Sequence, residues 1–235
     1  MIQTYLYLFG IWEPNLSALI DERLQKGGTF VDVGANIGYH TLLAAKRLGE
    51  KGKVVAIESS PKVFSLLGNS IATNGLEQNI RTVNKAASET VGVLPLFEGP
   101  DQNSGLSTTV QTRGLPSECE IPAAPLGELL EADEIATARL VKIDVEGAEG
   151  AVLAGMGSFL DQCPHDVEVL VELSPEWWED KSLTSQDVLK PLLDRGFHVY
   201  EIEKNLWPWR YLWPKEIRRT RRSTRSLTER VKQLD

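Results

Sequence analysis

The chain of 235 residues is poor in cysteine, with only Cys119 and Cys163. These two lie far apart and show no metal-binding spacing, so we expect free thiols and a reducing, cytoplasmic setting. No apolar stretch is long enough to cross a bilayer, which predicts no transmembrane segment. Residues 5–12 are apolar, but the stretch is short and no basic region precedes it. A signal peptide is therefore not expected.

Positive charge is scarce outside the C-terminal end of the chain. The formal net charge is −8, yet residues 215–235 hold eight basic and three acidic residues, a net +5, which leaves −13 for the rest. An acidic body opposes phosphate binding, so we expect no nucleic-acid partner. The basic segment could meet an anionic partner or fold back on the body, but a solvated terminus is the reading we favour.

Residues 29–41 are typical of a buried strand, a tight turn and the start of a helix. Residues 29–33 are β-branched or aromatic apart from one acid, as in a central parallel strand. Gly34 and Gly38 mark the turn, and an apolar helical stretch then runs to about residue 48. Such a unit opens nucleotide-type cofactor sites, because a backbone without side chains lets a ligand approach closely.

The spacing of this turn is Asp-x-Gly-x-Asn-x-Gly, and the Gly-x-Gly-x-x-Gly fingerprint of dinucleotide-binding proteins is missing. A carboxylate at Asp32 would repel a pyrophosphate but suits a cationic ligand such as S-adenosylmethionine (SAM), directly or through water. Glu58 follows the next strand, where an acid accepts hydrogen bonds from ribose hydroxyls. Together with Gly34, Asn36 and Gly38, these residues fit a SAM pocket better than an NAD pocket. A plain turn without a ligand would leave both acids unexplained.

Strands alternate with helices along the chain, which predicts an α/β fold with a doubly wound, mostly parallel sheet and helices on both faces. The expected strands are 29–33, 54–57, 80–84, 138–143, 167–173 and 197–202, with an extra strand at 91–97 and an irregular or edge strand within 205–214. We divide the chain into an N-terminal arm and helix covering the cofactor site (1–28), a cofactor-binding domain (29–214) and a basic tail (215–235).

Four acids follow or end predicted strands: Asp32, Glu58, Asp144 and Glu172. In an open parallel sheet the ligand lies beyond the carboxyl ends of the strands, at the switch point in strand order. We therefore expect these acids to converge on one rim, and this convergence is the main argument for an active site.

Several polar and small residues complete the predicted site. Ser59 begins the turn into the next helix, Asn69 lies within that helix, and small residues at 86–88, including Ala86, leave room for a flat adenine ring. Residues 98–120 are rich in Gly, Ser, Thr, Asn and Pro, as in a functional lid or a mobile surface loop, and the two readings have equal weight. Its candidate substrate-contacting residues are Asn103, Ser104, Gly105, Ser107 and Thr108.

With these residues in view, the chain resembles the FkbM family of SAM-dependent methyltransferases over residues 11–203. The matching segments are 30–41, 54–61, Asn69 with 74–75, 86–88 and above all 141–149, Val-Lys-Ile-Asp-Val-Glu-Gly-Ala-Glu. The resemblance implies a Rossmann-like sheet with a final antiparallel strand and SAM as methyl donor. It also implies O-methylation of a hydroxyl on a sugar or secondary metabolite. Many members have histidine or a similar residue after the fifth-strand acid, where this chain has Leu173.

Methyl transfer to a hydroxyl needs an aligned nucleophile and a group that accepts its proton. The candidate bases are Asp144, Glu146 and His40. Glu172 is assigned to the substrate side, and Lys142 is expected to pair with an acid. Hard oxygen ligands at the strand ends suit magnesium, but three acids do not establish a site, so we assign no metal.

Three other functions compete with methylation of a small-molecule hydroxyl. An NAD-type oxidoreductase conflicts with Asp32 and the missing glycine fingerprint. A non-catalytic binding module that uses the Trp- and Arg-rich C-terminal end conflicts with the intact set of strand-end acids. Methylation of bases conflicts with the acidic body and with the absence of an Asn/Asp-Pro-Pro-Tyr/Phe segment.

Overall fold

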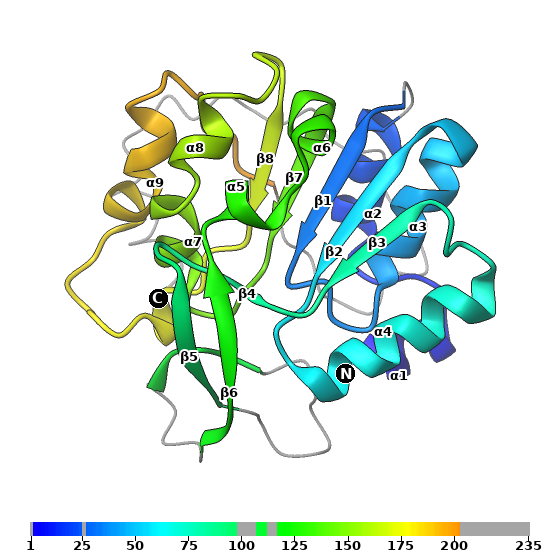
Figure 1. Cartoon of the computed structure of the whole chain (residues 1–235), viewed down its shortest axis with the longest axis horizontal. Helices are drawn as coiled ribbons and strands as arrows, with labels where there is room; N and C mark the ends of the chain where they lie inside the picture. Colours follow the sequence, from blue (N-terminus) through cyan, green and yellow to red (C-terminus); the bar gives the residue numbers. More distant parts are fainter. Residues whose placement is uncertain (1, 25–26, 98–106, 112–116, 203–235) are drawn as a thin grey trace.

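The computed structural model describes residues 2–24, 27–97, 107–111 and 117–202 (Figure 1). Three predicted features lie outside these residues: the substrate residues 103–105, the Trp-rich segment 205–214 and the basic tail 215–235.

The centre of the fold is a five-stranded sheet with the order β3-β2-β1-β7-β8, in which every pair of neighbours is parallel. The sheet winds in one direction from β1 to β3 and in the other through β7 and β8, so the switch point lies between β1 and β7. The strands are β1 (Thr29–Val33), β2 (Lys53–Ile57), β3 (Ile80–Val83), β7 (Ala138–Ile143) and β8 (Glu168–Val171). The predicted doubly wound α/β fold is thus confirmed.

Helices cover both faces of this sheet because successive side chains of a strand point to opposite sides. Phe30, Val54, Ala56 and Leu140 pack against α2 (Pro14–Arg23), α3 (Tyr39–Leu48) and α4 (Pro61–Asn74). Their neighbours Val31, Val55, Val141 and Ile143 pack against the second helical layer. That layer consists of α5 (Leu126–Leu129), α6 (Ala132–Ala136), α7 (Glu149–Ala154), α8 (Gly157–Leu160) and α9 (Ser185–Leu193).

The helix after β2 begins and ends with residues typical of helix boundaries. The Oγ atom of Ser60 accepts a hydrogen bond from the N–H of Val63, Pro61 occupies the first helical position, and Gly75 closes α4 in a left-handed conformation. This cap fixes the chain immediately after Glu58.

A second, smaller sheet with the order β4-β6-β5 adjoins the carboxyl-end rim of the main sheet (Figure 1). It contains β4 (Ala86–Ala87), β5 (Gly92–Phe97) and β6 (Ser117–Ala124). The extra strand predicted at 91–97 is confirmed. Residues 86–87 do not continue β3: they leave the main sheet and pair with Ala123 and Ala124. Likewise, the predicted loop 98–120 ends earlier, since β6 begins at Ser117.

The N-terminal residues of the predicted arm form α1 (Ile2–Phe9), in which Tyr5 packs on Phe9. One further prediction needs correction. Residues 197–202 form no strand: only Tyr200 makes an isolated bridge. A strand exists only where a neighbour pairs with it, and in the described part of the chain the sheet ends at β8. Two short 3₁₀ helices, Gly49–Lys51 and Pro175–Trp177, complete the elements described here.

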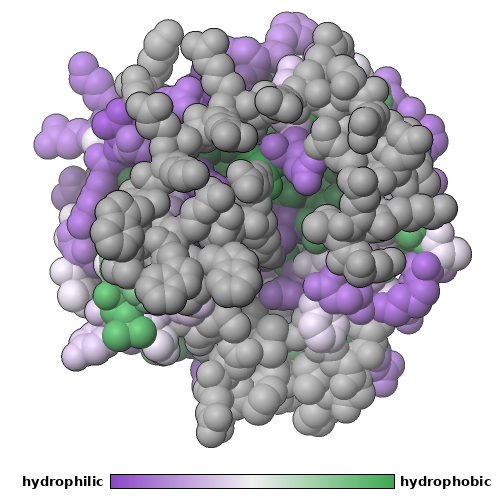
Figure 2. Space-filling view, turned by 180° about the vertical axis from the view of Figure 1, so that it is seen from behind, coloured by the Kyte–Doolittle hydropathy of each residue, from purple (hydrophilic) through white to green (hydrophobic). Residues whose placement is uncertain are grey.

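Within the described residues, no helix combines the length and apolar character required for a transmembrane span. Figure 2 shows the face opposite to that of Figure 1, and among the residues that carry a hydropathy colour there, hydrophilic ones predominate and apolar ones form small groups.

Candidate active site

The turn between β1 and α3 is pressed tightly against the ends of the neighbouring strands. The N–H groups of Gly34 and Ala35 both donate to the carbonyl of Ile57, at 2.9 and 3.0 Å. Gly34 has φ +78°, and a Cβ atom at this position would lie 1.9 Å from the carbonyl oxygen of Asp144. Gly38 has φ +91°, and a Cβ there would lie 2.6 Å from a methyl group of Leu67. Both glycines are therefore required by the fold, and they leave the backbone without a side chain at these two positions.

Glu58 lies beside this turn, held by backbone donors. Its Oε2 accepts from the N–H of Asn36 at 2.8 Å and its Oε1 accepts from the N–H of Ser60 at 2.9 Å. Asn84 donates to the backbone carbonyls of Glu58 and Ser59, at 2.8 and 3.0 Å. Burial raises the pKa of Glu58 from 4.5 to about 7, although the two backbone N–H groups oppose this shift. The carboxyl group is thus fixed at the end of β2.

Asn36 is the polar residue between the two glycines of the turn. It adopts a left-handed conformation with φ +52°, and its Oδ1 accepts from the N–H of Ile37 at 2.8 Å. Asparagine tolerates this conformation better than most residues, since its side chain can bond locally to the backbone. Asn36 therefore shapes the turn and, through its own N–H, orients Glu58.

Asp32 is fully buried and its carboxylate is occupied by protein groups. The hydroxyl of Thr41 donates to Oδ2 at 2.6 Å, and the ammonium of Lys142 lies 3.4 Å from Oδ1. Burial raises the pKa of Asp32, while Lys142 and Thr41 oppose this rise. Asp32 therefore anchors α3 and β7 to β1, and it has no surface for direct contact with a ligand.

Lys142 pairs with two acids, as the sequence predicts. Besides Asp32, its Nζ atom contacts Oδ2 of Asp144 at 3.1 Å. Burial alone would lower the pKa of Lys142, but the carboxylates of Asp144 and Asp32 outweigh it and raise the pKa above its usual value. The side chain of Asp144 keeps 30% of its surface exposed, whereas Asp32 keeps 1%. Of the two acids, Asp144 is the one that can meet a substrate.

The loop after β7 folds around the buried carboxylate of Glu149. This carboxylate accepts from the N–H of Gly147 and from the indole N–H of Trp178, both at 2.9 Å. Gly147 has φ +96°, and a Cβ there would lie 2.8 Å from Trp177. Glu146 also has a positive φ, +47°. No pattern in the sequence points to the contact between Glu149 and Trp178, since the two are 29 residues apart.

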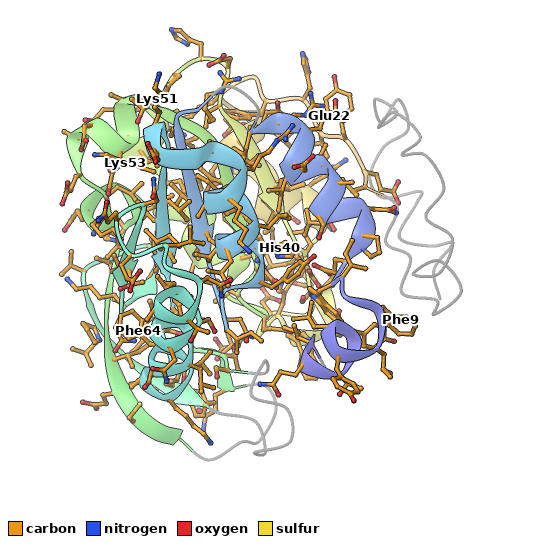
Figure 3. The ribbon with its side chains drawn as sticks, turned by 90° about the vertical axis from the view of Figure 1, so that its right-hand side faces the viewer. Phe9, Glu22, His40, Lys51, Lys53 and Phe64 are labelled. Carbon is orange, nitrogen blue, oxygen red and sulfur yellow. The ribbon has the colours of Figure 1, made fainter. Side chains whose placement is uncertain are left out.

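His40 lies in the first turn of α3 with 6% of its surface exposed. Figure 3 shows it between α3 and the N-terminal helices. Its Nε2 atom is 4.0 Å from Oε2 of Glu13, the residue before α2. Burial and the positive charge of Lys142 hold the pKa of His40 well below its usual 6.5, so the imidazole is neutral at physiological pH. Glu13 did not stand out in the sequence.

The other predicted site residues are distributed around the rim. The hydroxyl of Thr108 donates to the backbone carbonyl of Glu146 at 2.8 Å, which ties this part of the predicted substrate wall to the loop after β7. The backbone N–H of Glu172 donates to the carbonyl of Ile143 at 2.9 Å, at the end of β8. Ser59 is half-buried, Ala86 is buried in β4, and Asn69 is exposed on α4. In the described segments, no three His, Cys, Asp or Glu side chains are grouped to hold a metal ion.

Comparison with known proteins agrees with this architecture. The hexuronic acid methyltransferase AglP of Haloferax volcanii is 30% identical over 149 residues, which cover 63% of this chain but only 58% of AglP. The methyltransferase sdnD of Sordaria araneosa is 26% identical over 198 residues, 72% of this chain and 73% of that protein. A putative rRNA-methylase from Clostridium thermocellum shares the fold, with a TM-score of 0.52 at 11% identity over 81% of this chain and 85% of that one.

The family assignment follows from the segment that contains the glycine turn, Glu58, Lys142 and Glu149. The Methyltransferase FkbM domain matches residues 32–199, which is well over half of the chain. The protein belongs to the FkbM methyltransferase family.

Proposed function

We propose that this methyltransferase uses SAM as its methyl donor and methylates a hydroxyl group of a small molecule, such as a sugar or a secondary metabolite. The observation that carries the SAM assignment is the carboxyl group of Glu58, fixed by the N–H groups of Asn36 and Ser60 at the end of β2. An acid in this position accepts hydrogen bonds from the two ribose hydroxyls of an adenosine.

The residues around Glu58 fit such a cofactor. Gly34 and Gly38 leave the backbone bare at both ends of the turn, and a Cβ at either glycine would collide with the structure around it. The small side chain of Ala86 lies just beyond β3, the strand next to β2, where it leaves room for a flat ring. The expected contacts are thus ribose at Glu58, adenine toward Ala86, and the amino-acid end toward the switch point between β1 and β7.

When bound, SAM supplies an electrophilic methyl group on a positively charged sulfur. The chain must then hold the acceptor hydroxyl in line with that methyl group and accept the proton that the oxygen loses. We assign proton acceptance to Asp144, because it stands at the end of β7 beside the glycine turn and is partly exposed. Lys142 orients this carboxylate at 3.1 Å. Glu146 is the second candidate base.

The acceptor is expected to lie against the loop after β7 and the end of β8. Thr108 and Glu146 border this region together, since the hydroxyl of Thr108 donates to the carbonyl of Glu146. Glu172 completes its far side at the end of β8. The similarity to AglP, whose name gives hexuronic acid as its substrate, makes a sugar hydroxyl the first acceptor to test.

Calorimetric titration with S-adenosylhomocysteine, the reaction product of SAM, tests the cofactor assignment. We expect binding in the micromolar range, no binding of NAD, and a loss of affinity in Glu58→Ala. Glu77→Ala, an exposed acid in the turn after α4, is the matched control and should bind like the wild type. Absence of S-adenosylhomocysteine binding to the folded wild-type protein would refute the proposal. A panel of hexuronic acids and other hydroxyl compounds, followed by mass spectrometry for a 14-Da gain, then identifies the acceptor.

A further inference from the structure

Glu13 stands out as a buried acid in a strained backbone conformation. Its φ and ψ are +44° and +69°, in the left-handed region that residues with a side chain rarely adopt. It precedes α2, yet its carboxylate caps no N–H of that helix. Only 10% of the side chain is exposed. The carboxylate is directed inward instead, toward His40 on α3.

His40 has a polar atom that the described structure leaves unsatisfied. Its Nε2 is buried and has no hydrogen-bond partner among the described residues, although Oε2 of Glu13 lies 4.0 Å away. Because the imidazole is neutral, this approach is not an ion pair. Buried polar atoms normally have a partner, so an unsatisfied nitrogen that faces a carboxylate indicates that a polar group belongs between them.

The electrostatic surroundings favour a cation as that group. Lys142 feels the carboxylates of Asp144, Asp32 and Glu13, all of which raise its pKa. Within the described part of the chain, Lys142 is the basic side chain in ion-pair contact with Asp32 and Asp144. Three carboxylates thus act on one ammonium beside the switch point, and the neutral His40 adds no positive charge there.

We propose that Glu13 and His40 bind the α-ammonium group at the amino-acid end of the cofactor. This inference rests on the proposed SAM dependence. It adds Glu13 as a binding residue, which lies outside the family match because that match begins at residue 32. An ammonium group has three N–H donors, and two acceptors 4.0 Å apart can share one such group at ordinary hydrogen-bond lengths. In this arrangement the imidazole proton is on Nδ1, so that Nε2 accepts.

The location agrees with the rest of the site. Asp32 and Lys142 lie on the sheet face that α2 and α3 cover, and Glu13 and His40 belong to the beginnings of these two helices. Both carboxylate oxygens of Asp32 already have protein partners, Thr41 and Lys142, so this carboxylate is not available to the ammonium group of the cofactor. Glu13 supplies the carboxylate that Asp32 cannot offer.

A comparison of two ligands distinguishes a binding role of Glu13 and His40 from a structural role. S-adenosylhomocysteine carries the amino-acid end, whereas 5′-methylthioadenosine has the same adenosine and sulfur without it. In calorimetric titration, we expect Glu13→Gln to bind S-adenosylhomocysteine about tenfold more weakly than the wild type does. Its affinity for 5′-methylthioadenosine should be unchanged. His40→Phe, which keeps an aromatic ring but accepts no hydrogen bond, should show the same selective loss at about threefold or more. Glu58→Ala should weaken both ligands.

Glu22→Gln is the matched control, because Glu22 is an exposed acid near the other end of α2 (Figure 3). It should bind both ligands like the wild type. Equal weakening of both ligands by Glu13→Gln would make Glu13 a structural residue and overturn the inference, as would unchanged binding of S-adenosylhomocysteine. If the folded wild-type protein binds neither ligand, the proposed SAM dependence itself fails. Retained 5′-methylthioadenosine binding shows that each variant is folded.

Discussion

The Nζ atom of Lys142 on β7 lies 3.4 Å from Oδ1 of Asp32 on the neighbouring strand β1, and both side chains are buried. Strand order reverses between these two strands, so this ion pair joins the two halves of the sheet. The same ammonium also holds Asp144, which reaches the surface. One buried lysine therefore links the stability of the fold to the orientation of the proposed base.

Lys142→Met removes the cation and leaves Asp32 buried without a charge partner. We expect the free energy of unfolding at pH 7 to fall by about 3–5 kcal/mol, measured by urea denaturation. The loss should be smaller at pH 5, because the pKa of Asp32, already raised by burial, rises further without Lys142 and the group takes up a proton. Lys190→Met removes an exposed pair with Asp194 and should change stability by less than about 0.5 kcal/mol. Equal losses in the two variants would contradict the prediction.

Binding of S-adenosylhomocysteine should strengthen as the pH rises through 7. The ribose hydroxyls donate to an ionised Glu58, whose pKa of about 7 leaves about a tenth of the groups ionised at pH 6. Titration calorimetry should therefore give an affinity about tenfold lower at pH 6 than at pH 8. Glu58→Gln should bind weakly with little pH dependence between these values. If the affinity of Glu58→Gln for S-adenosylhomocysteine still rose with pH, a group other than Glu58 would be responsible for the pH dependence.

Glu58 also predicts how the stability of the ligand-free protein depends on pH. Its pKa is about 7 in the folded protein and 4.5 as the ordinary value, so the folded state binds the extra proton between these two pH values. The contribution of Glu58 to the free energy of unfolding should therefore fall as the pH rises from about 4.5 to 7. Urea denaturation of wild type and Glu58→Gln across this range isolates that contribution, since the variant has no carboxyl group to titrate. Identical pH profiles for the two proteins would contradict it.

Local sequence patterns predicted the parts of the fold that depend on local chemistry. The strands 29–33 and 138–143 are mostly apolar or β-branched, and Ser60 with Pro61 has the chemistry of a helix start. Because parallel strands must end at the same rim, the grouping of Glu58, Asp144 and the glycine turn also follows from the sequence.

The contacts that sequence reasoning missed all join distant segments. Trp178 and Glu149 are 29 residues apart, and the Glu13–His40 approach joins two helix starts. The two-residue strand Ala86–Ala87 exists only because Ala123 and Ala124 pair with it. Residue spacing and secondary-structure propensity do not predict such contacts, because the contacts form only when the chain folds back on itself.

Gly34→Ala tests the close approach of the glycine turn to β7. The added Cβ would lie 1.9 Å from the carbonyl oxygen of Asp144, and φ is +78°, so the backbone must move. We expect a loss of stability of more than about 2 kcal/mol in urea denaturation and weaker S-adenosylhomocysteine binding. Gly68→Ala is the control: Gly68 is exposed in α4 with open space around it, and alanine there should stabilise by about 0.5–1 kcal/mol. A neutral Gly34→Ala would show that the turn can relax.

Trp178→Phe tests the hydrogen bond that organises the loop after β7. The indole N–H donates to Oε2 of the buried Glu149, whose pKa burial raises. Without this donor, the carboxylate keeps the N–H of Gly147 but loses its side-chain partner. We expect a loss of about 1–3 kcal/mol in urea denaturation at pH 7. A double-mutant cycle with Glu149→Gln should give a coupling energy above about 0.5 kcal/mol, whereas additive effects would mean that the bond contributes nothing to stability. Because this loop carries Asp144 and Glu146, methyl transfer should decline in Trp178→Phe even where the protein remains folded.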